Sequence, residues 1–547
     1  MTALSRAIAA GTDGARVCPR WLVLTLAGIG FLVLWGLPTI IIPLATDQVL
    51  YALGARTILD GGQLYRDYWE IKPPLVFLIY TIPFAIAGEH MEAIRVLDLI
   101  NTALAMGAVF LLSRRLFNER AAVFAAGFYG FSYLTWARFD SLAETESFMA
   151  APLALAFFLY RPEDGRRDAW PRALAAGLLL GMAFALKGTA LLFVLGLPAA
   201  ELLLRSEGRW TAGGALRRLT LAALGFLLVP AALTVYLAAG GVLDDFIDIQ
   251  RHYTAPYNAF RWPTGGAYLR FLLETTSDWI TSAPFIVVPA AIALFFALYR
   301  PRQAAGVYFM ALLAMLGVLG ICWQGKMLRY HWLIVIPLLA PLAGYAVDRV
   351  IDLFRPLADW RSWAAWALLT FGLLVLAFQP LIETYDNYRN LISFADGSLS
   401  RRELEVRYLP QFQRNHELVD YVRANGDEDD RLFIWGFWPV DYFWLDRPLV
   451  SRFPENVGLR ATWAPASWRD ELMEDLRSAP PRFLAVARGD NQPWLVGTSE
   501  TSDQHLRDSF PELRKFIERG YVPVQDLELF VLYERAPATV QGDPPSR

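Results

Sequence analysis

The sequence predicts a polytopic α-helical membrane domain of about eleven spans, followed by an α/β domain outside the cytoplasm. The 547-residue chain is 55% hydrophobic and only 19% charged, which is less charge than a soluble protein of this size carries. Several apolar runs reach or approach the roughly 20 residues that cross a bilayer. Beyond residue 382 the apolar runs become short, so we expect two domains, 1–382 and 383–547.

The predicted spans follow one another through the first domain, with ends uncertain by a few residues. Their ranges are 21–45, 93–112, 121–139, 143–160, 173–186, 188–204, 219–240, 279–299, 304–323, 331–347 and 363–382. The first run is too long for the core of a signal peptide, and no small-residue cleavage site follows it. We therefore interpret it as a retained span whose helix ends at Ala45.

The segment 73–88 is apolar but short, and it begins with two prolines. If it does not cross, the arginine-rich loops all fall on one side, which the positive-inside rule assigns to the cytoplasm. These arginines are Arg6, Arg16 and Arg20; Arg114, Arg115 and Arg120; Arg161, Arg166, Arg167 and Arg172; Arg205, Arg209, Arg217 and Arg218; Arg300 and Arg302; and Arg349, Arg355 and Arg361. We therefore expect 73–88 to lie against the bundle on the outer side, covered by protein or water.

Two other segments belong to the outer side in this topology. In 48–60, Val49, Leu53 and Ile58 share one helical face, which predicts an amphipathic helix lying in the membrane interface. The loop 241–278 begins with acidic residues and continues with aromatic ones.

The C-terminal domain alternates short apolar runs with helical patterns, which predicts a small α/β domain with a partly parallel sheet. The runs are 432–437, 483–487 and 530–533, and the helical patterns include 468–479 and 505–519. An odd number of spans places this domain outside the cytoplasm. It contains no evident convergent acid–base or metal-binding set, and we expect its His416 and His505 to be solvated. The domain is therefore predicted to do no chemistry.

Composition also excludes several classes of protein. Cys18 and Cys322 are the only cysteines, so neither a disulfide framework nor a zinc-binding spacing is present. The net charge of −3 gives no reason to expect a nucleic-acid partner.

Asp47 is the sharpest candidate for chemistry, because it follows the first apolar run at the expected lipid–water boundary. At a helix C-terminus, a carboxylate faces the unfavourable negative end of the helix dipole. Function would justify that position. The alternative is an exposed interfacial acid, which is common at the ends of spans.

Glu70 and Lys72 form a second candidate pair within the run Tyr65-Arg66-Asp67-Tyr68-Trp69-Glu70-Ile71-Lys72-Pro73-Pro74. The prolines restrict the local backbone. Lys72 could hold a phosphate as a point charge. The alternative is a lysine that snorkels to the interface.

Charged residues within or beside later spans are further candidates. Glu146 lies in the fourth predicted span, and Lys187 interrupts the apolar run 173–204 on the outer side. Intramembrane acids are functional by default, whereas Lys187 could equally be a charged turn. Arg95 and Asp98 are three residues apart, which predicts a structural ion pair.

Arg329 and His331 precede the tenth predicted span, beside Lys326 and Tyr330. Two cations, a phenol and an imidazole suit the wall of a phosphate site. The alternative is an interfacial belt of aromatic and basic residues.

Taken together, these motifs resemble those of the GT-C membrane glycosyltransferases. The resemblance is to the branch that holds protein O-mannosyltransferases, lipid A aminoarabinose transferases and rhizobial galacturonosyltransferases. It extends over about the first 350 residues. It rests on Asp47, the run 65–74, Arg95, Glu144-Thr145-Glu146, the stretch from Gly181 to Gly188, and Arg329-Tyr330-His331.

The resemblance implies a glycosyltransferase of the plasma (inner) membrane that moves a sugar from a polyprenyl-phosphate donor to a lipid, glycan or protein acceptor, with inversion, at the outer face. Asp47 would be the catalytic residue. The substrate-binding residues would be Glu70, Lys72, Glu146, Lys187, Arg329 and His331. No metal ligand is assigned, and a divalent metal remains open. Many relatives carry a second acid after the loop aspartate, where this chain has Gln48.

Two other functions compete with this interpretation. A transporter or lipid flippase would explain the spans and the buried charges, but its site is expected near the midplane and in paired halves. A membrane scaffold or receptor would use the outer domain without catalysis. Within the transferase interpretation, the outer domain would admit or orient the acceptor.

Overall fold

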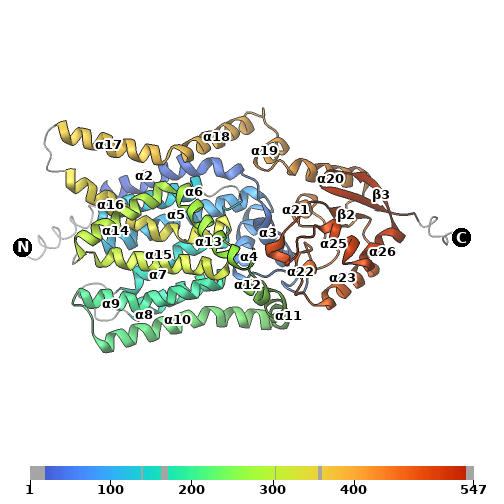
Figure 1. The fold of residues 1–547 in the computed structure, drawn as a ribbon, viewed down its shortest axis with the longest axis horizontal. Coiled ribbons are helices and arrows are strands. Elements are labelled where there is room, and N and C mark those ends of the chain that lie inside the picture. Colours follow the sequence, from blue (N-terminus) through green and yellow to red (C-terminus); the bar gives the residue numbers. More distant parts are fainter. Residues whose placement is uncertain (1–18, 137–139, 162–169, 302–303, 355–359, 538–547) are drawn as a thin grey trace, which may run out of the picture.

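The computed structural model describes residues 19–136, 140–161, 170–301, 304–354 and 360–537. A helical bundle occupies one end of the molecule and a small α/β domain the other, with short helices between them (Figure 1). Cys18 and the predicted cytoplasmic Arg6, Arg16, Arg166, Arg167, Arg302 and Arg355 lie outside the described residues.

Each predicted span corresponds to a helix of the bundle. These are α2 (Pro19–Gly36), α5 (Met91–Leu116), α6 (Glu119–Trp136), α7 (Thr145–Tyr160), α8 (Trp170–Leu186), the 3-10 helix η2 (Gly188–Leu195) with α9 (Gly196–Ser206), α10 (Ala212–Ala239), α14 (Pro284–Tyr299), α15 (Ala305–Gln324), α16 (Ile336–Phe354) and α17 (Trp360–Leu376). By length and composition, four described helices can cross a membrane, or up to seven if each bent pair counts as one span. The chain is a multi-pass membrane protein, and the figure of eleven spans stays a prediction.

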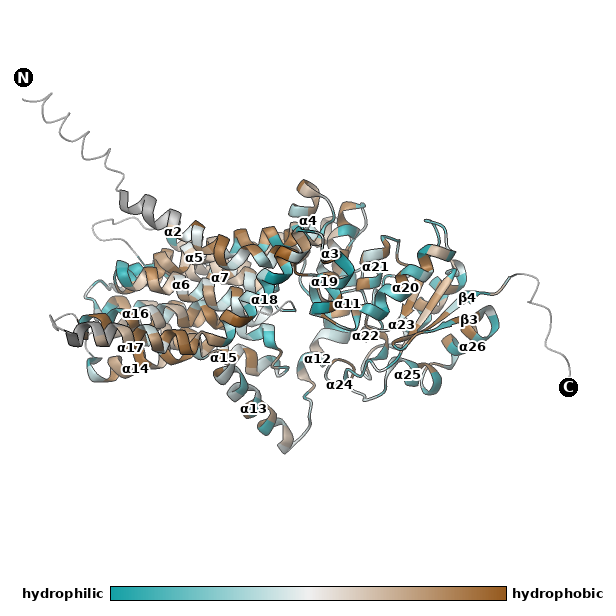
Figure 2. Cartoon of the chain, turned by 90° about the horizontal axis from the view of Figure 1, so that it is seen from above, coloured by the Kyte–Doolittle hydropathy of each residue, from teal (hydrophilic) through white to brown (hydrophobic). Residues whose placement is uncertain are grey.

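Glycines let the bundle helices approach closely. A side chain at Gly177 of α8 would meet the carbonyl oxygen of Ala222 in α10 at 2.0 Å, and one at Gly225 would meet that of Leu174 at 2.1 Å. Small residues at helix contacts are typical of membrane bundles, where close packing replaces the hydrophobic effect as the source of association. Apolar residues dominate the bundle and hydrophilic ones the opposite end (Figure 2).

The end predicted for the first helix, Ala45, is wrong. The helix stops at Gly36 and is followed by the 3-10 helix η1 (Leu37–Ile41), an extended stretch, and a new helix, α3 (Thr46–Leu59), bent by 78°. Pro38 lies in η1 and Pro43 in the extended stretch, and a proline removes the backbone donor that a continuous helix needs. Asp47 therefore begins a helix and does not end one.

The predicted interfacial helix 48–60 is also different in the structure. It corresponds to α3, which is buried over most of its length, including the polar Gln48. It packs against α4 (Leu75–Ala87), which covers the apolar segment expected at 73–88, and against α21 (Val440–Leu445) of the C-terminal domain. An amphipathic pattern predicts a half-buried helix, but it cannot reveal that a distant domain covers the second face.

The remaining segments before the C-terminal domain are also helical. They are α11 (Leu243–Ile249), the π-helical turn η3 (Gln250–Thr254), α12 (Ala255–Ala259), α13 (Gly266–Ser282), the 3-10 helix η5 (Arg329–Ile334), α18 (Phe378–Ala395) and α19 (Arg401–Tyr408). The predicted domain boundary at 382/383 falls within α18.

The C-terminal domain contains a mixed four-stranded sheet in the order β1-β2-β4-β3. Its elements are α20 (Phe412–Asn425), β1 (Leu432–Trp435), α21, α22 (Val457–Arg460), α23 (Ala466–Ser478), β2 (Phe483–Ala487), α24 (Pro493–Val496), α25 (Ser502–Asp508), α26 (Pro511–Gly520), β3 (Tyr521–Asp526) and β4 (Phe530–Arg535). Strands β1 and β2 pair in parallel, with Phe433 opposite Leu484. Strand β4 is antiparallel to β2 and to β3.

The predicted runs match β1, β2 and β4, whereas β3 is missed. Strand β3 is a largely exposed edge strand that contains Pro523, and proline is tolerated at a sheet edge because no partner needs its missing donor. The predicted solvation of the two histidines is wrong. His505 is buried, and His416 lies 2.9 Å from the Glu405 carboxylate and stacks on Trp444.

Candidate active site

A cavity of about 940 Å³ lies between one end of the helical bundle and the C-terminal domain. Its walls come from the start of α3, the segment 69–74, the α8–η2 break, α11, η3, α12, η5 and three loops of the C-terminal domain. Six of the seven predicted site residues line it: Asp47, Glu70, Lys72, Lys187, Arg329 and His331. Glu146 lies behind the wall, paired with Lys187.

Asp47 occupies the first turn of α3, at the helix N-terminus. The predicted conflict with the helix dipole is therefore wrong, because the positive end of the dipole stabilises a carboxylate there. Gln48 stands where many relatives carry a second acid. It has a structural role, since its side-chain oxygen accepts from the backbone N–H of Ala45 at 3.2 Å.

Arg95 holds the backbone around Asp47 in place. This fully buried guanidinium donates to the carbonyl oxygens of Ile42 (3.0 Å), Pro43 and Leu142 (3.3 Å), and to the Gln48 side chain (2.9 Å). These bonds connect the approach to α3 with the approach to α7. The role of Arg95 is structural, as its position in the sequence suggested.

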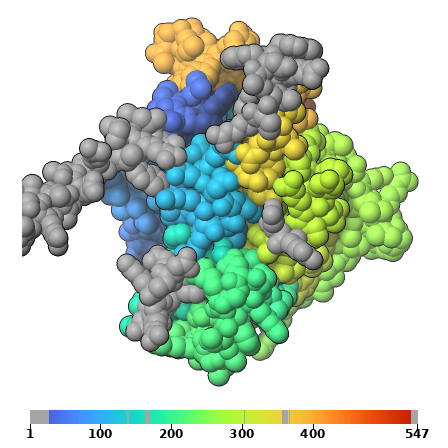
Figure 3. Space-filling model, turned by 90° about the vertical axis from the view of Figure 1, so that its left-hand side faces the viewer, coloured from blue at the N-terminus to red at the C-terminus, as the bar shows by residue number. Residues whose placement is uncertain are grey.

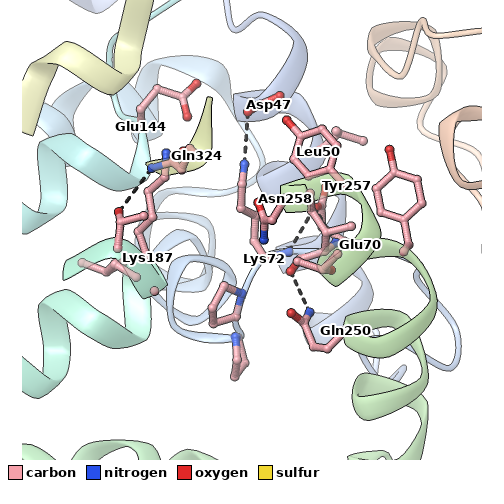
Figure 4. A pocket seen from close by; sticks show the side chains of 18 of the residues that line it. Asp47, Leu50, Glu70, Lys72, Glu144, Lys187, Gln250, Tyr257, Asn258 and Gln324 are labelled. Carbon is pink, nitrogen blue, oxygen red and sulfur yellow. Dashed lines mark hydrogen bonds and ion pairs between the residues drawn. The ribbon is translucent and has the colours of Figure 1, made fainter. Parts of the chain in front are cut away.

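Lys72 lies at the centre of the cavity, paired with Asp47 (Figure 4). Its Nζ donates to Asp47 Oδ2 at 3.1 Å and to the Tyr51 hydroxyl at 2.8 Å, and Tyr51 in turn donates to Glu144 Oε2 at 3.1 Å. Burial lowers the pKa of Lys72, but the carboxylates of Asp47 and Glu70 outweigh it and raise that pKa above its ordinary value. Lys72 is therefore a permanent cation.

Glu70 supports the backbone of its own loop. Its Oε1 accepts from the N–H groups of Ile71 (2.6 Å) and Lys72 (3.2 Å). The Tyr65 hydroxyl donates to the Lys72 carbonyl at 2.9 Å. These bonds, with the two following prolines, fix the segment that presents Lys72.

A second ion pair joins Lys187 to Glu146. Lys187 lies on the opposite side of Lys72 from Glu70, Gln250 and Tyr257 (Figure 4). Lys187 stands where α8 ends and η2 begins, so the predicted break in the run 173–204 is confirmed. Glu146 lies in the first turn of α7, after Glu144 at its N-cap, and both are buried.

Arg329 and His331 belong to η5 on the bundle side. Arg329 donates to the carbonyl of Trp136 at 2.7 Å and stacks over its ring at 4.5 Å. His331 is buried, and its Nδ1 has no hydrogen-bond partner within the part of the chain that the structure describes. Lys326, which precedes η5, donates to the carbonyls of Phe260 and Trp494. The bond to Trp494 connects this segment to the C-terminal domain.

Several lining residues were not among the predicted site residues. Glu144, part of the motif that carries the resemblance, lines the cavity, as do Gln250 and Asn258 of the segment 241–278. Glu455 comes from the C-terminal domain, for which no chemistry was predicted. Glu455 is separated from β1 by α21, and no local pattern in the sequence marks it. Among the described residues, no three His, Cys, Asp or Glu side chains are grouped as a metal site.

Comparison with known proteins agrees with this architecture. Residues 71–237 match the model of the dolichyl-phosphate-mannose-protein mannosyltransferase family. The undecaprenyl phosphate-alpha-4-amino-4-deoxy-L-arabinose arabinosyl transferase of Pseudomonas savastanoi pv. phaseolicola is 26% identical over 184 residues, which cover 32% of this chain and 33% of that protein. The match thus spans about a third of the curated relative.

Solved structures extend the similarity to nearly the whole chain. ArnT from Cupriavidus metallidurans bound to undecaprenyl phosphate superposes with a TM-score of 0.59 at 17% identity, covering 96% of this chain and all of ArnT. The apo state of ArnT gives 0.61 at 16% identity over 96% and 99% of the chains. At this identity the likeness concerns the fold. The predicted resemblance to the GT-C membrane glycosyltransferases is thus confirmed, by a family match over residues 71–237 and by a fold shared with ArnT.

Proposed function

We propose that this chain is a glycosyltransferase that moves a sugar from a polyprenyl-phosphate donor to an acceptor at the outer face of the membrane, with inversion. The observation that carries the proposal is the partly buried Asp47–Lys72 pair in a large cavity at one end of the bundle. The names of the similar proteins support it, since they include dolichyl-phosphate and undecaprenyl phosphate.

In the proposed reaction, the donor phosphate binds to the cations on the cavity wall, Lys72, Lys187 and Arg329. The Asp47 carboxylate takes the proton of the acceptor hydroxyl while the acceptor oxygen forms a bond to the anomeric carbon. The bond from that carbon to the phosphate oxygen breaks on the opposite face, and the phosphate leaves with the electron pair. The cations stabilise the charge that develops on the phosphate.

The Asp47–Lys72 contact implies that the donor binds before Asp47 takes a proton from the acceptor. A carboxylate that accepts a bond from an ammonium at 3.1 Å is a weak base. A donor phosphate draws the flexible Lys72 ammonium away, because the phosphate offers a stronger anionic partner. Asp47 then becomes more basic when the donor is in place, which limits proton transfer to the loaded site.

A direct test is product formation by the purified protein. It would be incubated with a panel of polyprenyl-phosphate sugars and with lipid, glycan and peptide acceptors, and the products identified by mass spectrometry. We expect one donor to yield a glycosylated acceptor with the wild type but not with Asp47→Asn. Lipid translocation in vesicles without any glycosylated product would favour a flippase instead.

We further propose that the chain lies in the plasma (inner) membrane with the C-terminal domain outside, and that α4 does not cross. In a cysteine-free background, a membrane-impermeant thiol reagent should label Lys515→Cys in intact cells but Ser206→Cys only after lysis. Asp60→Cys and His90→Cys flank α4 and should label from the same side. Labelling of these two from opposite sides would contradict the topology.

A further inference from the structure

One of the C-terminal segments that line the cavity, 452–458, packs on Trp69. The backbone N–H of Trp69 donates to the backbone carbonyl of Arg452 at 2.7 Å. The Arg452 guanidinium in turn donates to the carbonyl of Tyr65 at 2.8 Å. A side chain at Gly458 would meet the Trp69 ring at 2.6 Å, so only glycine allows this approach. The loop is therefore docked on the segment that carries Glu70 and Lys72.

Glu455 projects from this loop into the cavity wall. Its side chain is nearly buried, with the residue 6% exposed, and it lines the cavity. The adjacent Asn456 fixes the loop, since its N–H donates to the Gly436 carbonyl at 3.1 Å and its side-chain amide to the Ser502 hydroxyl at 2.7 Å. The position of the Glu455 carboxyl is thus determined by the domain fold.

The Glu455 carboxyl is left unsatisfied. Its Oε2 is buried and has no hydrogen-bond partner among the residues that the structure describes. A buried polar atom without a partner costs free energy, and a polar group of a ligand in the cavity would remove that cost.

The surroundings of the Glu455 carboxyl favour its protonated form over a wider pH range than usual. Burial raises the pKa of Glu455 well above its ordinary value, and the carboxyls of Glu70 and Asp47 raise it further, against the effect of Lys72. A neutral carboxyl both donates and accepts a hydrogen bond. That capacity matches a hydroxyl or amino group, which also donates and accepts.

We infer that Glu455 contacts the substrate, with its carboxyl hydrogen-bonded to a hydroxyl or amino group of a saccharide held in the cavity. The inference rests on the proposed function and deepens it. The saccharide has two sources, the acceptor and the donor sugar. Lys187 and Arg329 lie on the bundle side and Glu455 on the domain side, which favours the acceptor.

The test compares Glu455→Ala and Glu455→Gln with the wild type, using the donor and acceptor found in the product screen. Asp441→Asn is the control, because Asp441 is a buried carboxyl of the same domain that does not line the cavity. Glu455→Ala should raise the acceptor KM roughly 10- to 100-fold, as expected for a lost buried hydrogen bond. Glu455→Gln, which still donates and accepts, should retain most of the activity.

Two readouts separate the sources. A raised acceptor KM with unchanged donor Kd assigns the contact to the acceptor, and a weakened donor Kd or altered donor hydrolysis assigns it to the donor sugar. Unchanged constants in Glu455→Ala, while the wild type transfers sugar, would overturn this inference alone. If Glu455→Ala does not fold, Glu455→Asp takes its place, with the same expected rise in KM. A wild type that transfers no sugar would overturn the proposed function and this inference together.

Discussion

Charged side chains are buried at both ends of the bundle, but they are satisfied to different degrees. At the end far from the C-terminal domain, the fully buried Asp348 of α16 accepts from Asn118 (2.8 Å), Arg120 and Arg349 (2.5 Å). Figure 3 shows this end, where the segment near residue 120, in blue, lies beside that near residue 350, in yellow. Both carboxylate oxygens of Asp348 have partners.

The cavity end is left incomplete. Oε1 of Glu144, Nδ1 of His331 and Oε2 of Glu455 are buried without hydrogen-bond partners, as far as the described ranges of the chain extend. A satisfied buried charge holds helices together, whereas unsatisfied buried groups around a cavity can gain hydrogen bonds when a ligand enters. Burial alone does not identify a site, and the full satisfaction of Asp348 contrasts with the incomplete satisfaction of Glu144, His331 and Glu455.

The largest effect should come from Asp47→Asn. The change removes the proposed base but keeps the side-chain shape, so transfer should fall by roughly 10²- to 10⁴-fold with normal folding. Asp60→Asn, at the exposed end of the same helix, is the control and should be active. Near-normal turnover of the Asp47 variant would remove it from the mechanism.

The next effect concerns donor binding. Lys72→Gln should weaken donor Kd by roughly 10- to 100-fold, because a phosphate loses a charged hydrogen bond in a buried site. Binding of a fluorescent polyprenyl phosphate measures it, and Lys515→Gln on the surface serves as the control. If Lys72→Gln binds the donor as tightly as the wild type, Lys187 becomes the first candidate for the phosphate.

At the end of the bundle far from the cavity, we expect a substitution to change stability and not transfer. Asp348→Ala should lower the free energy of unfolding by about 1–2 kcal/mol, a modest value because both arginine partners are about a third exposed. Transfer per folded molecule should stay unchanged. Thermal unfolding in detergent and activity of the folded fraction test this, and a catalytic defect with normal stability would remove the contrast between the two ends.

The smallest effect tests a buried carboxyl that lies in neither cluster. Asp441 has one bond, from Asn415 at 3.0 Å, and burial raises its pKa well above the ordinary value. Its stability contribution is fully present below the unfolded pKa near 3.8 and is lost as the pH rises through the folded pKa.

Asp441→Asn should therefore raise the unfolding midpoint by roughly 2–4 °C at neutral pH, the shift expected for about 1 kcal/mol. The gain should fade toward pH 4, where the wild-type carboxyl is protonated. A gain that did not depend on pH would contradict the titration of Asp441.

Local patterns in the sequence predicted the segments but not their junctions. The apolar runs located the bundle helices and three of the four strands, because buried segments consist mainly of apolar residues. The sequence did not show that α3 starts at Thr46, since Arg95 stabilises that bend through contacts far along the chain.

The candidate site shows the same limit. Six predicted residues converge on one cavity because they lie near the ends of apolar segments on one side of the bundle, a position that hydropathy reveals. Glu455 was missed because nothing local marks it. It reaches the cavity only through the docking of a loop on Trp69, some hundreds of residues earlier in the chain.

That docking also limits how independently the two domains can move. Trp69 carries the C-terminal loop, and Lys72 follows three positions later, before the rigid Pro73-Pro74 pair. Three extended residues span only about 10 Å, so the chain between them has little slack. A tilt of the C-terminal domain therefore displaces the Lys72 ammonium, so the orientation of that domain sets the position of the charge at the centre of the cavity.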